Sequence, residues 1–339
     1  MIDAATYRDT ADWISRWRRP ALISHAKADG DAIGSLVAMR SFLARRNVAA
    51  SAILFDPLPD RYARFNRFAP LTVCKNPAQA ASTLDAADAL ILLDTCAFSQ
   101  LEPVADWLRR SPTPKLAIDH HGTRDELADC YLIDESAPAT CSILFDLARA
   151  AGWSIDSEAA EALFVGIATD TGWFRHSNTD ARAMSACAEL MALGVRPNEL
   201  FESFYLQDSA GRVRLLAQAL ASLELHSSDR LSLMTLPREA FVRAAAKSSD
   251  TEEIVNEPLR IASVVVSVLL VEQEDGQTRI NLRSKPPVGG TTRLDVDVAG
   301  IARGFGGGGH RRAAGARIRG SLSEVRERVL SELTKTFED

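Results

Sequence analysis

Four segments of this chain place acidic and imidazole side chains directly after apolar runs. Three of these runs, residues 21–24, 89–93 and 116–118, are short and bounded by turn residues, which is typical of buried strands. The chemistry-bearing residues that follow the strands are His25, Asp29, Asp31, Asp94, Asp119, His120 and His121. Strands that alternate with helices predict a parallel sheet, so their carboxyl ends share the edge where α/β proteins bind ligands. If the strand geometry continues, His120 and His121 point to opposite sides.

The fourth segment is a predicted helix from Ser157 to about Thr169, which runs into Asp170. A carboxylate at a helix C-terminus opposes the macrodipole, and a bound cation would offset that cost. Each segment also has a purely structural interpretation. Asp31 would then be a helix N-cap and Asp29 a turn residue, while the other acids would lie in polar turns. Three acidic strand ends at one sheet edge favour the functional interpretation.

Converging carboxylates raise one another's pKa unless cations lie between them, and only Lys27 is close in sequence. Oxygen ligands with two or three imidazoles and no thiolate favour Mn²⁺ or Mg²⁺, with Fe²⁺ or Co²⁺ as alternatives. The number of carboxylates predicts two ions roughly 3.5–4 Å apart, bridged by a carboxylate and a hydroxide. Such a pair activates water for hydrolysis, most naturally of phosphate esters.

A glycine run near the C-terminus needs a separate interpretation. Gly304, Gly306 and Gly309 match the spacing of a dinucleotide fingerprint, but they follow a predicted helix rather than a strand, which argues against that function. Residues 301–320 contain five arginines, His310 and no acid. Exposed backbone N–H groups in this basic stretch could cradle phosphate, and a flexible glycine turn is the alternative.

The 339 residues, of which 46% are hydrophobic and 25% charged, predict a soluble protein of two domains. The net charge of −6 disfavours a long nucleic-acid track but permits a small anionic substrate in a local positive pocket. No apolar stretch is long enough for a membrane span, and the N-terminus lacks a signal peptide. Five scattered cysteines without a Cys-x-x-Cys pair indicate reduced thiols in the cytoplasm and argue against structural zinc.

The patterning predicts an α/β fold: a doubly wound, mainly parallel sheet, then a smaller α/β domain with a mixed sheet. The expected boundaries are a catalytic domain at 1–195, a helical linker at 196–227 and a substrate-binding domain at 228–339. Residues 197–226 are expected to form one long helix or a helical hairpin, and residues 261–271 a strand. Ser321 and Glu324 have the spacing of a capping box, which opens the last helix.

Taken together, these motifs resemble those of the DHH phosphoesterases. The first motif runs from His25 to Ser35, followed by Leu93–Thr95, by Asp119-His120-His121 and by Thr169–Gly172; residues 307–315 resemble the signature of the DHH-associated C-terminal domain. Length and linker are similar to the NrnA-like nanoRNase branch rather than to the larger RecJ exonucleases. Two positions depart from the pattern: Ala28 stands where proline is usual, and His176 stands where tyrosine is common, with an open role.

The resemblance implies a role for each matching residue. One metal would be held by His25, Asp29 and Asp94, and the other by Asp31, Asp94, His120 and Asp170, with Asp94 as the bridge. Asp119 would orient an imidazole or the backbone, and His121 would contact the scissile phosphate or assist the leaving group. The distal phosphate or terminal base would be gripped by Arg283, Ser284, Gly307, Gly308, Gly309 and His310.

The expected function is hydrolysis of short oligoribonucleotides to 5′-mononucleotides, or of 3′-phosphoadenosine 5′-phosphate to AMP, in a cleft between the domains. Cyclic dinucleotides or their linear products are alternative substrates, because metals recognise phosphate rather than its substituents. Inorganic pyrophosphate is a weaker alternative, since the basic glycine segment suits a nucleotide. An inactive nucleotide-binding regulator is the alternative of a different class. The resemblance also implies a homodimer.

Overall fold

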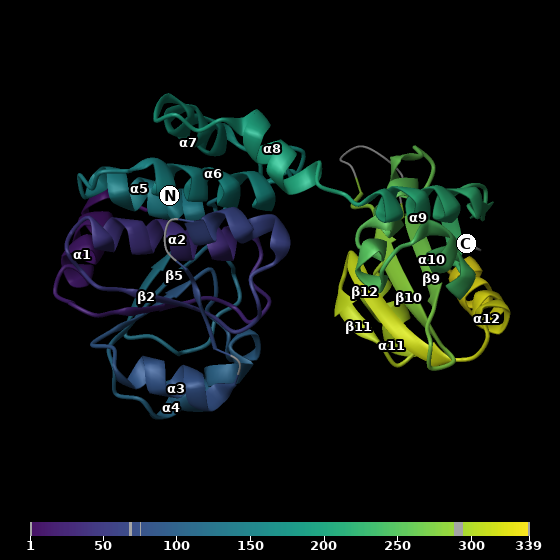
Figure 1. Ribbon diagram of the computed structural model, residues 1–339, viewed down its shortest axis with the longest axis horizontal. Coiled ribbons are helices and arrows are strands. Elements are labelled where there is room, and N and C mark those ends of the chain that lie inside the picture. The colour runs from purple at the N-terminus through teal and green to yellow at the C-terminus, as the bar shows by residue number, and fades with distance from the viewer. Residues whose placement is uncertain (1, 68–69, 75, 288–293, 338–339) are drawn as a thin grey trace. The chain divides into compact units, whose positions relative to one another are not determined.

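The computed structural model describes residues 2–67, 70–74, 76–287 and 294–337, which fold as two compact α/β units, Met1–Gln207 and Asp208–Asp339 (Figure 1). This division differs from the expected one, because no separate linker lies at 196–227. Helix α8 (Pro197–Tyr205) buries Leu200 and Phe204 in the first unit, whereas α9 (Ala210–Ala221) buries Leu215 and Ala219 in the second. The last residues of the expected helical segment form an edge strand, β7 (Glu224–His226). No described helix is long and apolar enough to cross a membrane.

The first unit contains a six-stranded parallel sheet in the order β3-β2-β1-β4-β5-β6. Its strands are β1 (Ala21–Ile23), β2 (Ser51–Leu54), β3 (Thr72–Val73), β4 (Leu90–Leu93), β5 (Lys115–Asp119) and β6 (Cys130–Ile133). The chain winds outward in opposite directions from β1 and from β4, so the topological switch point lies between these two strands. Open α/β sheets bind their ligands outside the carboxyl ends of the strands at such a point. The predicted doubly wound sheet is therefore confirmed.

Helices cover both faces of this sheet (Figure 1). One face packs against α1 (Ala4–Ile14), α2 (Gly30–Ala44), α5 (Thr140–Ala150) and α6 (Ser157–Asp170), with α7 (Ala181–Ala192) beyond them. The other face packs against α3 (Pro77–Asp85) and α4 (Ala105–Arg110). Helices α2 and α6 approach closely, because a Cβ at Gly34 would lie 2.5 Å from the Ala162 carbonyl oxygen. The close packing fixes two helices that carry candidate ligands, Asp31 and Asp170.

The second unit has a mixed sheet in the order β11-β12-β10-β9-β8-β7, in which only β8 and β9 pair in parallel among the described strands. Its other strands are β8 (Leu231–Leu236), β9 (Val266–Glu272), β10 (Gln277–Ser284), β11 (Gly308–His310) and β12 (Ala313–Arg319). One face packs on α11 (Val298–Gly304) and α12 (Leu322–Thr334), and part of the other on α9 and α10 (Arg238–Ala244). The expected capping box at Ser321 opens α12.

Two local predictions in this unit need correction. The strand expected at 261–271 begins only at Val266, because the chain before it forms a 3₁₀ turn, Ile254–Arg260, followed by a short bend. The glycine segment expected as a loop instead forms the edge strand β11, which pairs with β12. Glycine is needed there: a Cβ at Gly307 would lie 2.1 Å from the Gly315 carbonyl oxygen.

Candidate active site

The loop after β1 brings one imidazole and one carboxylate to the switch point. Asp29 caps α2, since its Oδ1 accepts hydrogen bonds from the backbone N–H groups of Asp31 (3.0 Å) and Ala32 (3.1 Å). The helix cap is thus Asp29 rather than Asp31. His25 Nε2 lies 3.8 Å from Asp29 Oδ1 and 3.6 Å from Asp94 Oδ2, which places all three side chains around one point.

Asp31 lies in the first turn of α2, fully buried against the start of α5. Its Oδ2 accepts a hydrogen bond from the Thr140 N–H (2.6 Å), and its Oδ1 accepts one from the Cys141 N–H (2.9 Å). The positive end of the α5 dipole favours this negative charge. Space is provided by Gly166 on α6, where a Cβ would lie 2.7 Å from Asp31 Oδ1. The carboxylate is therefore fixed by backbone donors rather than by a charged partner.

Asp94 is the first residue after β4, and its backbone adopts the left-handed region, with φ at 60°. This conformation is uncommon for a residue with a side chain and tends to occur where function requires it. The side chain is 1% exposed, and Asp94 Oδ1 accepts a hydrogen bond from Thr140 Oγ1 (3.0 Å). Asp94 Oδ2 lies near His25, while Oδ1 lies 3.7 Å from His120 Nε2. Asp94 thus stands between two imidazoles from different strands.

The tripeptide after β5 is organised by the buried carboxylate of Asp119. Its Oδ1 accepts hydrogen bonds from the backbone N–H groups of His120 (2.8 Å) and His121 (3.1 Å), and it lies 2.8 Å from His121 Nδ1. Because β5 ends at Asp119, strand alternation does not continue. The condition under which the two imidazoles would point to opposite sides is therefore not met, and their ring centroids lie 4.4 Å apart.

His120 has a ring nitrogen that lacks a partner. Its Nδ1 lies 3.1 Å from the Ala137 carbonyl oxygen, which requires that Nδ1 carry the proton. The Nε2 lone pair then points into the site, where it is buried without a hydrogen-bond partner. It lies 3.7 Å from both Asp94 Oδ1 and Asp170 Oδ2. A lone pair that faces two carboxylates is unfavourable alone and favourable around a metal ion, whose imidazole ligands are commonly fixed through the other nitrogen.

Asp170 is the last residue of α6, as predicted. Asn178 Nδ2 donates to the Pro138 carbonyl (3.1 Å) and the Asp170 carbonyl (3.3 Å), with Asp170 Oδ2 3.5 Å away. His176, whose role the sequence leaves open, packs on Gly172, and its Nδ1 lies 3.4 Å from the Asp170 carbonyl oxygen. These contacts fix the backbone around Asp170 while its carboxylate points toward His120.

The candidate ligands fall into overlapping groups whose ligand atoms lie within 4.8 Å of one another. The groups are His25, Asp29 and Asp94; Asp31, His120 and Asp170; and Asp94, His120 and His121. No described lysine or arginine forms an ion pair with these carboxylates. The donor set of carboxylate oxygens and imidazole nitrogens without thiolate ligands fits hard or borderline divalent cations.

The electrostatics of the cluster show the same deficit of positive charge. Burial, together with neighbouring carboxylates, raises the pKa of Asp31 to about 6 and that of Asp170 to about 7. The same causes raise the pKa of Asp94 well above its ordinary value. Burial works to lower the pKa of His25, but hydrogen bonds and charges from Asp29 and Asp94 outweigh it and raise this pKa to about 10. The cluster therefore holds protons where cations would otherwise lie.

Sequence reasoning missed Thr140, Cys141 and Asn178, which support the site without carrying its obvious chemistry. The relevant signal in the sequence is the start of helix α5 at Thr140, because a helix N-terminus is a ready partner for a carboxylate. What it lacked was the partner: Asp31 and Thr140 are 109 positions apart in sequence.

Apart from His121, the expected substrate-binding residues belong to the second unit. Arg283 is half-buried on β10, and its Nη1 donates to the Leu282 carbonyl oxygen (3.0 Å). Ser284 is buried, and its hydroxyl donates to the Val296 carbonyl oxygen (2.9 Å). The glycines and the imidazole of the expected loop form the exposed strand β11, Gly308–His310.

Comparison with known proteins places these features in context. Residues 21–167 match the family model described as DHH family, N-terminal domain, and residues 239–339 match the DHHA1 domain. A bifunctional oligoribonuclease and PAP phosphatase NrnA from Thermus thermophilus is 30% identical over 321 residues, which cover 93% of this chain and 90% of that protein. The NrnA of Bacillus subtilis is 28% identical over 245 residues, 71% of this chain and 74% of that protein.

Solved structures agree with this fold. An exopolyphosphatase-related protein from Bacteroides fragilis superposes with a TM-score of 0.87 at 25% sequence identity, covering 100% of this chain and 99% of that one. An exonuclease RecJ bound to manganese superposes with a TM-score of 0.56 at 14% identity, covering 98% of this chain and 95% of that one. The second likeness concerns the fold alone.

Proposed function

Because this chain belongs to the DHH family and carries the DHHA1 domain, we propose that it is a two-metal phosphoesterase acting on short nucleotide substrates. It would release 5′-mononucleotides from short oligoribonucleotides and AMP from 3′-phosphoadenosine 5′-phosphate. The observation that carries the proposal is the convergence of buried carboxylates and the partnerless His120 Nε2 without a described lysine or arginine paired to them.

Two divalent ions fit the three overlapping ligand groups, because Asp94 and His120 each belong to two of them. His25, Asp29 and Asp94 would hold one ion, while the other would be held by Asp31, Asp94, His120 and Asp170, so that Asp94 bridges. We propose Mn²⁺, with Mg²⁺, Co²⁺ or Fe²⁺ as alternatives for the same oxygen-rich donor set. When bound, two such ions lower the pKa of water and stabilise negative charge on the phosphoryl oxygens.

The chain's own residues orient the reacting groups. Asp119 fixes His121 through Nδ1, and its hydrogen bond is the main cause that raises the pKa of His121 to about 9. The imidazole is 46% exposed and protonated at neutral pH, so its Nε2–H is available to a phosphate or a leaving-group oxygen. We assign to His121 Nε2 the proton that the leaving oxygen needs. The Nδ1–H of His120 donates to the Ala137 carbonyl oxygen, which leaves Nε2 as the nitrogen that faces the site.

The second unit would bind the part of the substrate that does not react. Arg283 offers a half-buried guanidinium, and β11 offers an exposed backbone edge at Gly308 and Gly309 beside His310. Planar guanidinium groups match phosphate geometry. The Ser284 hydroxyl donates to the Val296 carbonyl oxygen, so this residue would position the backbone next to Arg283 rather than bind the substrate with its hydroxyl. We also retain the prediction that the protein is a homodimer, which is tested by measuring its molar mass by light scattering during size-exclusion chromatography.

A substrate panel tests the proposal. The full chain is incubated with Mn²⁺ and a diribonucleotide, a tetraribonucleotide, 3′-phosphoadenosine 5′-phosphate, a cyclic dinucleotide, its linear product and pyrophosphate. Products are separated by chain length, and Asp94→Ala from the same purification serves as the control for contaminating nucleases. We expect 5′-mononucleotides from the linear substrates and AMP from phosphoadenosine phosphate. Nucleotide binding without manganese-dependent turnover of any substrate would reject the enzyme and favour a regulator.

A further inference from the structure

A basic strip lies on the sheet of the second unit, on the face opposite the α11 and α12 core. Along β10 the residues alternate: Ile280 and Leu282 are buried in that core, so Arg279, Asn281 and Arg283 lie on the other face. Their partners on β12 are Arg317, Gly315 and Ala313. Helices α9 and α10 cover the part of this face formed by β8 and β9, and the buried residues of that core include none from β10 or β12.

Within the strip, Arg279 and Arg317 stand directly opposite each other on neighbouring antiparallel strands. Like charges in such a pair destabilise a sheet. Arg279 Nη2 donates to Thr251 Oγ1, but its Nε is buried without a hydrogen-bond partner. No described carboxylate forms an ion pair with either guanidinium. Burial, and then the charge of Arg317, lowers the pKa of Arg279, which is the direction expected where a negative partner is lacking.

The two arginines line a hollow of about 320 Å³. Asn281, Gly307 and Gly315 complete its polar and backbone lining. The glycines leave strand backbone uncovered beside the guanidinium groups, so a ligand here meets two positive charges and peptide groups, with no acid among the lining residues. These are the elements of an anion site.

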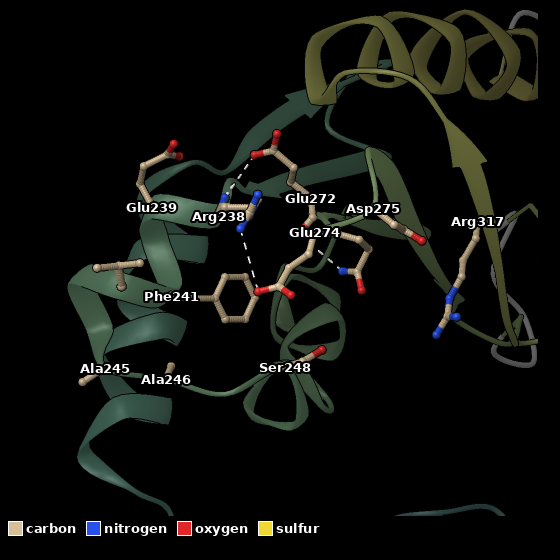
Figure 2. Close-up of a pocket in the computed structure, with 12 residues that line it drawn as sticks. Arg238, Glu239, Phe241, Ala245, Ala246, Ser248, Glu272, Glu274, Asp275 and Arg317 are labelled. Atoms are coloured by element: carbon tan, nitrogen blue, oxygen red, sulfur yellow. Dashed lines mark hydrogen bonds and ion pairs between the residues drawn. The ribbon is translucent and has the colours of Figure 1, made fainter.

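A larger neighbouring cavity of about 940 Å³ is a poor candidate for the same ligand (Figure 2). Four acids line it, Glu239, Glu272, Glu274 and Asp275, against the two arginines Arg238 and Arg317. Arg238 is already engaged by Glu272 and Glu274, its backbone N–H donating to Glu272 Oε2 (3.1 Å) and its Nη2 lying 3.8 Å from Glu274 Oε1. Net negative charge in this cavity would repel an anion. The glycine-lined hollow is therefore the place where the charge of Arg317 is available.

We propose that Arg279 and Arg317 form a phosphate subsite, distinct from the contact assigned to Arg283, that recognises substrates longer than a dinucleotide. The two sites are separated along β10 by four residues, or about 13 Å of strand. This separation exceeds the covalent distance between neighbouring phosphates of one strand. One molecule can therefore fill both sites only if it has non-adjacent phosphates. The length preference rests on the proposed function, in which Arg283 binds the same substrate.

Binding to the metal-free protein tests the subsite without requiring turnover. Fluorescein-labelled di- and tetraribonucleotides are titrated with the full chain in EDTA, and Kd is read from anisotropy. Arg317 is exposed, so Arg317→Gln should fold. Arg279→Gln is compared with it once melting curves have shown that both variants are folded. Arg319→Gln is the matched control, because Arg319 is also exposed, lies two residues further along β12 on the same face and carries the same charge.

We expect Arg317→Gln and Arg279→Gln to weaken tetranucleotide binding roughly fivefold to tenfold, the loss typical of one hydrogen bond. Dinucleotide binding should change less than twofold, and Arg319→Gln should change neither. Equal losses for both lengths, or an equal effect of Arg319→Gln, would overturn the subsite in favour of diffuse attraction. If this pattern appears while the substrate panel shows no turnover, the subsite stands and the enzymatic proposal fails.

A second titration distinguishes an oligonucleotide phosphate from free phosphate or AMP as the ligand of the subsite. Inorganic phosphate and AMP are titrated into the same metal-free variants by calorimetry. If the tetranucleotide loses affinity on Arg317→Gln and phosphate does not bind, the subsite takes an oligonucleotide phosphate. If phosphate or AMP binds to the wild type and this binding is lost in Arg317→Gln but not in Arg319→Gln, the anion site is upheld and its ligand is a free phosphate monoester. No length dependence and no binding of either probe would overturn the subsite.

Discussion

Each of the two units carries charged side chains without ion-pair partners, and the sign of the charge differs between the units. The first buries carboxylates at a sheet switch point, among described residues that offer imidazoles and backbone N–H groups but no paired lysine or arginine. The second displays arginines on an open sheet face, where Arg279 and Arg317 lie opposite each other. A protein that leaves charge unpaired in a fixed arrangement is complementary to a ligand of the other sign. We therefore propose that the first unit binds dications and that the second binds phosphates.

The difference in construction also matters. Asp31 and Asp94 of the first unit are fixed by hydrogen bonds from the start of α5, which is far away in sequence, whereas Asp29 and Asp119 accept hydrogen bonds from the backbone that follows them. In the second unit, Arg279 and Arg283 each donate one side-chain hydrogen bond to a described residue, from a strand near the sheet edge. We therefore expect substitutions in the first unit to abolish chemistry, and those in the second to tune affinity.

The largest effect is expected for Asp94→Ala, which removes the carboxylate that lies between His25 and His120 and that the proposal assigns to both ions. Both Mn²⁺ binding and turnover should be lost, with the rate falling by more than roughly a hundredfold, because several kcal/mol of charge stabilisation disappear. Calorimetric Mn²⁺ titration and initial rates measure the two effects. Retained activity would remove Asp94 from its bridging role.

A smaller loss is expected for Thr140→Val, which removes the hydroxyl that donates to Asp94 Oδ1. Partners that orient a metal ligand are typically worth about 10–100-fold in affinity or activity. Mn²⁺ affinity should fall by this amount, and Thr140→Ser should restore most of it. The matched control is Ser142→Ala, whose buried hydroxyl donates to the Ala139 carbonyl in the same turn and touches no ligand. Equal losses in Thr140→Val and Ser142→Ala would indicate general damage to α5.

In the second unit, Arg283→Ala should act mainly on KM. Loss of a guanidinium–phosphate contact should raise KM roughly tenfold, with kcat changed less than about threefold. Steady-state kinetics with a diribonucleotide measure both constants, and Arg319→Gln is again the charge-matched control. A fall in kcat at constant KM would contradict the assignment of catalysis to the first unit and of substrate binding to the second.

The smallest effect concerns the metal-free protein and pH. Asp31, Asp170 and His25 all have folded-state pKa values raised above their ordinary ones, to about 6, 7 and 10. Their protonated forms stabilise the fold, so this stability is present at low pH and is lost as pH rises through those values. In EDTA, Tm should therefore fall between pH 5 and pH 8. Metal binding requires deprotonated ligands, so with Mn²⁺ the trend should reverse.

Melting curves with and without Mn²⁺ measure this dependence. His226→Gln is a suitable control, because it alters a histidine of the second unit that pairs with Glu224 (3.1 Å) outside the candidate metal site. A Tm in EDTA that rises from pH 5 to pH 8 would contradict the excess of unpaired carboxylates in the first unit.

The sequence predicted the parallel sheet and the strand ends of the first unit, because a short apolar run indicates a buried strand and the acid that follows it marks the carboxyl end of that strand. It did not predict β6, since only Leu132 of its four residues is fully buried. Thr140 and Asn178 were also beyond reach, because their partners lie far away in the chain. Nor could the sequence show that Oδ1 of Asp119, the last residue of β5, accepts the backbone N–H groups of both following histidines.

In the second unit, the mixed sheet was predicted, whereas the glycine segment was not recognised as a strand. Glycine has low strand propensity, and only the close approach of Gly307 to Gly315 explains its presence. The boundary between the units differed because α8 and α9 each bury apolar residues four positions apart, and only packing decides which core each one joins. Local signals predict elements, but the partners of amphipathic helices are a tertiary property.

The most direct test of the account is the number of Mn²⁺ ions that the purified full chain binds. Metal-free protein titrated with Mn²⁺ and followed by electron paramagnetic resonance should take up two ions per chain, with a spectrum that shows magnetic coupling between them. A chain that binds no Mn²⁺, or that binds isolated ions equally well in the wild type and in Asp94→Ala, would contradict the proposed metal centre.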